Sequence, residues 1–139
     1  MEYPVHTRQQ VLDNPALTAF VLDTLVHNLS WLYGSEMDSP DNRDAWVHHN
    51  LQAPDPFWRL VVATRDSIPV GFLIFTVKNR TLYINDIQIL PAHRMNPALL
   101  RGLLRAMFGA AGDRFDTMRG YINRGNATSQ RNFLRFATS

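Results

Sequence analysis

The stretch Asp86–Leu99, with the sequence DIQILPAHRMNPAL, decides the fold of this chain. It opens inside an apolar and β-branched run over 81–90, which predicts a strand, and that run ends in front of Pro91. Asn96-Pro97 then predicts the start of a helix, since asparagine caps helices and proline suits the first helical position. Apolar residues recur at helical spacing over 99–111. The stretch is therefore predicted to form a strand, a loop and a helix in succession.

The residues on either side of this stretch predict further helices and strands. Asn14-Pro15 and Ser39-Pro40 each combine a capping residue with a proline and so predict two earlier helix starts. Short separations between the strands favour antiparallel hairpins. The expected elements in chain order are a strand over 3–8, helices over 14–33 and 39–51, strands over 57–64, 69–77 and 81–90, a helix over 96–112, a strand over 115–122 and a short helix over 126–136.

The order β-α-α-β-β-β-α-β-α predicts an α/β chain with an α+β layout, in which helices pack on a mainly antiparallel sheet. No repeat or linker divides the 139 residues, so one domain is expected over 1–139. The balance of 45% hydrophobic and 19% charged residues is typical of a globular protein. Every apolar run is far shorter than the ~20 residues of a membrane span, and the N-terminus lacks a signal-peptide layout. A cytoplasmic protein without a membrane partner is expected.

Composition also excludes several kinds of site. The chain has no cysteine, which excludes disulfides, thiolate catalysis and cysteine-based metal sites. The adjacent pair His48-His49 is not a metal motif, since neighbouring side chains on a helix point about 100° apart and no third ligand is spaced nearby. No metal site is expected.

Positive charge is concentrated towards the C-terminus. Residues 94–139 contain eight arginines and two aspartates, whereas residues 1–93 contain six lysines or arginines and ten acidic residues. A basic half of this kind is typical of a protein that binds phosphate groups, although a solvated arginine face has the same composition. Nucleic acid is the less favoured partner, because aromatic residues do not alternate with the basic ones.

Two segments together resemble the GNAT superfamily of acyl-CoA-dependent N-acyltransferases. Residues 86–94, DIQILPAHR, are similar to the strand of that family that runs into a proline and then an Arg/Gln-x-x-Gly-x-Gly/Ala loop. Residues 126–136, NATSQRNFLRF, are similar to its Asn-x-x-(Ala/Ser)-x-x-x-Tyr-x-(Lys/Arg) helix. The resemblance covers nearly the whole chain and implies a GNAT-like fold whose last strands are missing, as in short members of bacteriophage type.

The resemblance implies acetyl-CoA or coenzyme A as the cofactor. Its pantetheine arm would bond the backbone of Ile87 and Ile89, in the manner of an added strand. Its pyrophosphate would lie at the start of the next helix, where unpaired N–H groups and the helix dipole favour an anion. The residues implied in cofactor binding are Ile87, Ile89, Arg94, Met95, Asn96, Ala98, Leu99, Asn126 and Phe133.

Acetyl transfer to an amine also needs a base, since a protonated amine has no lone pair with which to attack. Asp86 is the candidate base by position, and an aspartate inside a strand is unusual. The alternative is an aspartate that faces solvent or pairs with an arginine. Phe133 replaces the tyrosine that serves many family members as the acid. Tyr121 is a weak alternative for that role, and Tyr83 or solvent are the others.

Departures from the family pattern support a second hypothesis. Pro97 and Leu99 occupy the two positions where the family has small residues, and proline has no N–H to donate. Missing last strands would leave an uncovered sheet edge, which favours a homo-oligomer or a larger assembly. The alternative to an N-acetyltransferase is therefore a GNAT-fold subunit without catalysis, with a structural or interaction role, for example in a virion.

Overall fold

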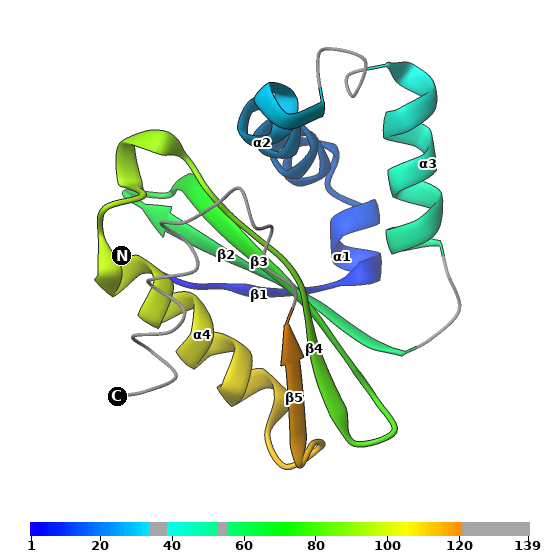
Figure 1. Ribbon diagram of the computed structural model, residues 1–139, viewed down its shortest axis with the longest axis vertical. Helices are drawn as coiled ribbons and strands as arrows, with labels where there is room; N and C mark the ends of the chain where they lie inside the picture. The colour runs from blue at the N-terminus through cyan, green and yellow to red at the C-terminus, as the bar shows by residue number, and fades with distance from the viewer. Residues whose placement is uncertain (34–38, 53–55, 121–139) are drawn as a thin grey trace.

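A twisted sheet with helices on both faces forms the centre of the computed structural model (Figure 1), which describes residues 1–33, 39–52 and 56–120 and, of residues 29–33, the backbone alone. In this part of the chain the sheet has five strands in the order β1-β2-β3-β4-β5. Neighbours are antiparallel except β4 and β5, which are parallel. The strands are β1 (Val5–Thr7), β2 (Phe57–Arg65), β3 (Ile68–Lys78), β4 (Thr81–Ile89) and β5 (Thr117–Gly120).

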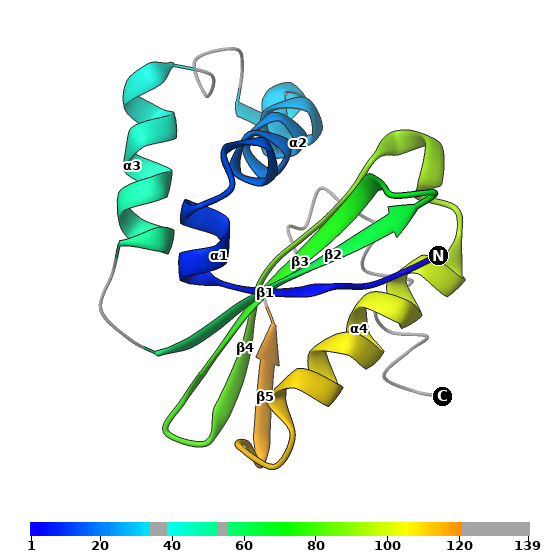
Figure 2. The same ribbon diagram turned by 180° about the vertical axis from the view of Figure 1, so that it is seen from behind.

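The helices divide between the two faces of the sheet (Figures 1 and 2). One face carries α1 (Arg8–Leu12), α2 (Pro15–Tyr33) and α3 (Pro40–Leu51), and the other carries α4 (Pro97–Ala111). A short 3-10 turn, η2 (Pro91–His93), separates β4 from α4. The predicted mixed α/β architecture is confirmed. Among the described residues, no helix is both long and apolar enough to pass through a bilayer.

Helix α1 is an element that the sequence prediction missed. The strand was expected to reach residue 8, but Thr7 ends it and caps a helix. The Thr7 hydroxyl accepts from the backbone N–H of Gln10 at 3.2 Å, and the Gln10 side chain accepts from the backbone N–H of Thr7 at 2.9 Å. This reciprocal capping box satisfies two helix-end donors at once. Val11, which the short helix carries, is fully buried.

Each face of the sheet has its own apolar core. The core under α4 is built from one set of alternating strand residues and one stripe of the helix, including Val61, Leu73, Phe75, Leu82, Leu99, Leu103 and Met107. The core under α1, α2 and α3 uses the opposite set, including Trp58, Leu60, Phe72, Ile74, Val21, Leu25 and Leu51. Alternation along a strand sends successive side chains to opposite faces, so β2 and β3 supply both cores.

Two tight turns make the β2–β3 and β3–β4 hairpins. Both central residues of each turn have positive φ: Asp66 and Ser67 in the first, Asn79 and Arg80 in the second. Positive φ at both positions defines the type I′ turn, whose twist matches that of paired strands. Arginine is an unusual occupant, since the left-handed region favours glycine and asparagine.

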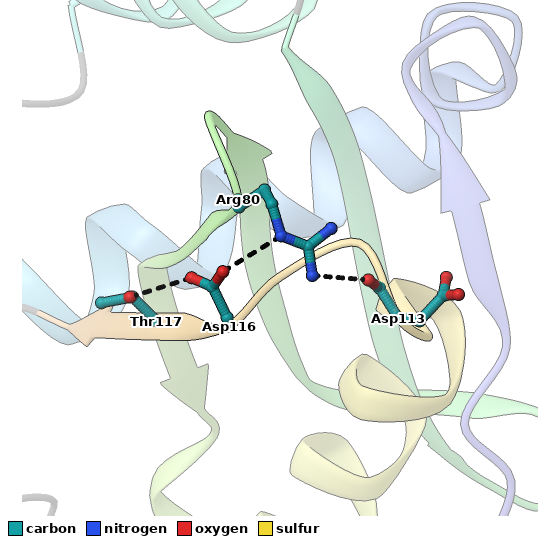
Figure 3. Close-up of polar contacts among 4 residues, drawn as sticks. All are labelled: Arg80, Asp113, Asp116 and Thr117. Atoms are coloured by element: carbon teal, nitrogen blue, oxygen red, sulfur yellow. Dashed lines mark hydrogen bonds and ion pairs between the residues drawn. The ribbon is translucent and has the colours of Figure 1, made fainter.

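Arg80 ties the tip of the second hairpin to the start of β5 (Figure 3). Its Nε donates to Asp116 Oδ2 at 3.1 Å and its Nη2 to the carbonyl of Asp113 at 3.2 Å. The Arg80 carbonyl accepts from the backbone N–H groups of Asp116 and Thr117. These bonds fix the parallel register in which Thr81 lies opposite Thr117. The exposed ion pair alone adds little stability, but together the bonds determine where β5 meets β4.

The N-terminal residues pack across the first half of α4 through a close contact of Tyr3 with Gly102. The Tyr3 hydroxyl donates to the carbonyl of Ala98 at 3.4 Å. A Cβ atom built at Gly102 would overlap the Tyr3 ring, whereas one built at Gly109 meets nothing within 4 Å. Gly102 therefore provides the space for Tyr3 on the helix surface.

We predict opposite effects for alanine at these two helical glycines. Gly109→Ala should stabilise the protein by about 1 kcal/mol, because alanine favours a helix over glycine by that amount. Gly102→Ala should give no such stabilisation, or should destabilise the protein, because the Tyr3 ring must move. In a Tyr3→Ala background, the same Gly102→Ala change should again stabilise the protein. Denaturant unfolding of the single and double variants measures both effects. Equal stabilisation by the two alanines in the wild-type background would contradict the packing.

Candidate active site at the end of strand β4

A one-residue bulge in β4 sets the directions of the candidate site residues. Ile84 lies opposite Phe75 and Asp86 opposite Ile74, so Asn85 is the extra residue on its strand. The Asn85 side chain donates to the Thr76 hydroxyl at 3.3 Å. An extra residue reverses the alternation of faces beyond it. Side chains after Asn85 therefore point to the face opposite from the one that an unbroken ladder would give.

The bulge separates the polar residues of β4 from the apolar ones. Ile87 and Ile89 pack against the α4 core, as Leu82 and Ile84 do before the bulge. Asp86 and Gln88 instead lie on the face that α2 covers. Their partners on β3 are Ile74 and Phe72, which belong to the core under α1, α2 and α3.

The same register indicates where the backbone groups point. The N–H of Leu90 donates to the carbonyl of Val70 at 3.0 Å, which marks a hydrogen-bonded pair. Hydrogen-bonded and non-hydrogen-bonded pairs alternate in an antiparallel ladder. Ile89 and Ile87 thus hold non-hydrogen-bonded positions, and their N–H and C=O groups point away from β3. No described residue of β5 pairs with them, since that pairing covers Thr81–Ile84.

The carbonyl of Ile89 accepts two side-chain hydrogen bonds. Nδ2 of Asn28, from α2, donates to it at 3.0 Å, and Nε of Arg94 donates to it at 3.3 Å. Arg94 Nη2 also donates to Asn28 Oδ1 at 2.7 Å. The arginine predicted to contact phosphate therefore lies folded back on the end of β4.

This group of contacts continues to Asp86. Asn28 Nδ2 also donates to Gln88 Oε1 at 3.0 Å, and Gln88 Nε2 donates to Asp86 Oδ1 at 2.8 Å. The structure thus joins Asp86, Gln88, Asn28 and Arg94 in one network, drawn from β4, α2 and the loop before α4. We call these four side chains the β4-end network.

The Asp86 carboxyl lies in a more buried environment than an ordinary surface carboxylate. Burial raises the pKa of its carboxyl to about 6, while hydrogen bonds from Gln88 and from the backbone N–H of Ile87 act in the opposite direction. No arginine pairs with it among the ion pairs of the described residues. The described residues therefore do not show the pairing of Asp86 with an arginine, which was one of the alternatives expected from the sequence.

The loop before α4 uses its own side chain for capping. Oδ1 of Asn96 accepts from the N–H of Ala98 at 3.1 Å, and the Asn96 carbonyl accepts from the N–H of Leu99 at 3.2 Å. Met95 is 82% exposed, whereas Leu99 is fully buried in the α4 core. Two of the N–H groups predicted to hold a pyrophosphate are thus bonded within the chain.

Several residues predicted for the site lie outside the β4-end network. Tyr121, Asn126, Phe133, the predicted helix over 126–136 and the chain end, where the last strands were expected to be missing, lie outside the described residues. Tyr83 is half-buried in β4, opposite Thr76 and so on the α2 face. No group of three or more potential metal ligands occurs in the described part of the chain.

Sequence reasoning missed Asn28 and Gln88. Asn28 is only 5% exposed and lies on the buried stripe of α2, a helical turn beyond Thr24 and Leu25. A polar residue within an apolar stripe was the available signal, since buried polar groups need partners. Its partners, which lie about 60 residues further on, had no comparable signal.

Comparisons with known proteins agree on the fold. No family model matches the sequence, and a search of curated proteins finds no match. Solved structures do match. The ribosomal-protein-alanine N-acetyltransferase from Brucella melitensis biovar Abortus 2308 has a TM-score of 0.68 at 15% identity, over 97% of this chain and 89% of that one. A possible acetyltransferase from Clostridium difficile 630 has a TM-score of 0.70 at 14% identity, over 98% and 88%.

A third structure was solved with a ligand. Aminoglycoside N-acetyltransferase AAC(6')-Iy in complex with CoA has a TM-score of 0.64 at 14% identity, over 96% of this chain and 86% of that one. At such identities the likeness is one of fold. The chain therefore has the GNAT fold, the fold of these acetyltransferases.

The raised pKa of Asp86 predicts that stability falls as pH rises. A carboxyl with a folded pKa of about 6 and an unfolded pKa of 3.8 contributes its stability fully below about pH 4 and loses it as pH rises through 6. Asp86→Asn should remove this loss. Relative to wild type, the variant should gain roughly 1–3 kcal/mol in unfolding free energy between pH 4 and pH 7.5.

Denaturant unfolding across that pH range measures the gain. Asp44→Asn, at an exposed position of α3, controls for the loss of one negative charge. Parallel pH profiles for wild type and Asp86→Asn would show that the carboxyl does not carry the raised pKa.

Proposed function

We propose that this chain is an N-acetyltransferase that moves the acetyl group of acetyl-CoA to an amine by direct attack. The observation that carries the proposal is the position of Asp86 in a GNAT fold. Its partly buried carboxyl directly precedes the Ile87 backbone, whose N–H and C=O groups point away from β3. A candidate base thus directly precedes backbone groups that no strand pairs on that side within the described residues.

The backbone after the bulge supports the binding of a pantetheine arm. The C=O of Ile87 and the N–H of Ile89 point to the side away from β3 and fit amide groups that add on like a strand, while the N–H of Ile87 bonds the Asp86 carboxyl. The Ile89 carbonyl already accepts from Asn28 and Arg94, so it is not needed for this contact. The Asn96 cap and Pro97 leave fewer N–H donors for a pyrophosphate, which increases the importance of Arg94.

Asp86 would take the proton of the acceptor amine. The neutral amine would then attack the thioester carbonyl, with the C–N bond forming and the C–S bond breaking so that its electron pair goes to sulfur. The proton that the nitrogen still has to lose would pass through solvent to the thiolate. A carboxyl with a pKa of about 6 is mostly ionised at neutral pH and is more basic than an ordinary aspartate. It stands on the α2 face of the sheet, so the amine would approach from that side.

We predict that Arg94 matters for coenzyme binding and that Arg105 does not. Arg94→Ala should weaken coenzyme A binding about tenfold, because a charged hydrogen bond contributes roughly 1.5–3 kcal/mol. Arg105, exposed on α4, is the matched control. Calorimetric titration with coenzyme A measures both. Equal effects of the two alanines would contradict the assignment of Arg94.

A second candidate function is a GNAT-fold subunit without catalysis, with a structural or interaction role. The observation that favours it is that the site satisfies itself: Asn96 holds the N–H groups of Ala98 and Leu99, and Arg94 and Asn28 hold the Ile89 carbonyl. Titration of the wild-type protein with acetyl-CoA separates the two functions. Binding at micromolar concentration supports the enzyme, whereas no heat at millimolar ligand, with a stable oligomer by light scattering, supports the subunit.

A further inference from the structure

Both N–H donors and the oxygen of the Asn28 amide bond other residues, three in all. Its two N–H donors go to Gln88 Oε1 and the Ile89 carbonyl, both at 3.0 Å, and its oxygen accepts from Arg94 at 2.7 Å. An asparagine side chain has two donors, so none is left over. At 5% exposure, the group is held where water hardly reaches it.

A structural role in α2 does not need this amide. Asn28 lies in the row of buried positions that Val21 and Leu25 occupy on the same helix, where a leucine would fill the space without any polar group. Asparagine is also a weaker helix former than leucine. The polar group is therefore explained by what it holds: the guanidinium on one side and the β4 side chains on the other.

We propose that Asn28 is a positioning residue that orients Arg94 for the cofactor and connects it, through Gln88, to Asp86. The proposal rests on the proposed acetyltransferase function for the first half of this statement only. Two of the five N–H donors of the guanidinium hold Arg94 at the end of β4, which leaves its remaining donors for an anion at the loop. Gln88 passes the contact on, because one amide group bonds both Asn28 and Asp86.

Replacement of Asn28 should therefore change two properties: the binding of coenzyme A, through Arg94, and the pKa of Asp86, through Gln88. Without the Asn28 amide, Arg94 loses its bond at 2.7 Å and is held only by the longer bond of its Nε to the Ile89 carbonyl, so coenzyme A binding should weaken about tenfold. Gln88 loses its anchor as well, so its hydrogen bond to Asp86 weakens. That bond favours the charged carboxylate, so its loss should raise the pKa of Asp86.

The test uses Asn28→Leu, which keeps the size of the side chain, and Asn28→Ala, which avoids crowding should leucine prevent folding. Asn50→Ala is the matched control, since the Asn50 side chain bonds only the Trp46 carbonyl of its own helix in the described structure. The two readouts are the coenzyme A dissociation constant by calorimetry and the Asp86 carboxyl titration by carbon NMR. A purely packing role for Asn28 would change stability without moving the Asp86 titration.

Weaker coenzyme A binding together with a raised Asp86 pKa, both absent in Asn50→Ala, supports the proposal. A change in only one of the two properties, or in neither, overturns the connection. If the wild-type protein binds no coenzyme A, the proposed function fails, and the Asp86 titration alone then decides whether Asn28 acts on Asp86 through Gln88. An unmoved titration in both Asn28 variants overturns it in that case too.

Discussion

The single extra residue in β4 is the constraint on which the arrangement of the site depends. In an unbroken ladder Asp86 and Gln88 would share a face with Leu82 and Ile84, and both would be buried under α4. Asn85 removes that conflict by reversing the alternation. The apolar pair after it then completes the core under α4, and the polar pair faces α2. One bulge thereby places the apolar side chains in the core under α4 and the polar side chains at the candidate site.

The polar groups that the bulge directs to α2 are then satisfied almost entirely by side chains. Asn28, Gln88 and Arg94 exchange hydrogen bonds of 2.7–3.3 Å with each other and with the Ile89 carbonyl. Buried polar groups need such partners, and a network whose members share partners is more rigid than separate pairs. The candidate base Asp86 lies at one end of this network and Arg94, the candidate phosphate-binding residue, at the other, so one set of side-chain hydrogen bonds connects the two.

Local signals predicted most of the fold. Proline with a capping residue located three helices, and hairpin spacing located the antiparallel strands, because both are set by neighbouring residues. The capping box at Thr7 is just as local and was present in the sequence, yet α1 was missed. The site was less accessible. Asp86, Arg94 and the isoleucine backbone follow from a strand-loop-helix pattern, whereas the contact between Asn28 and Arg94 joins residues 66 positions apart and has no periodicity to indicate it.

The turn at Asn79 and Arg80 shows a sequence that is not optimal for its own hairpin. Glycine would adopt the φ of 59° at the second position without steric cost, and Asn-Gly is the pair that favours such a turn most. Arginine is kept at a conformational disadvantage, and its side chain reaches across to Asp116 and Asp113. A consensus design of this hairpin in isolation would replace it and would gain local stability. The same change would remove the two side-chain bonds to the segment before β5 and leave only the backbone bonds of residue 80 to hold it, so the best isolated hairpin and the best sheet call for different residues here.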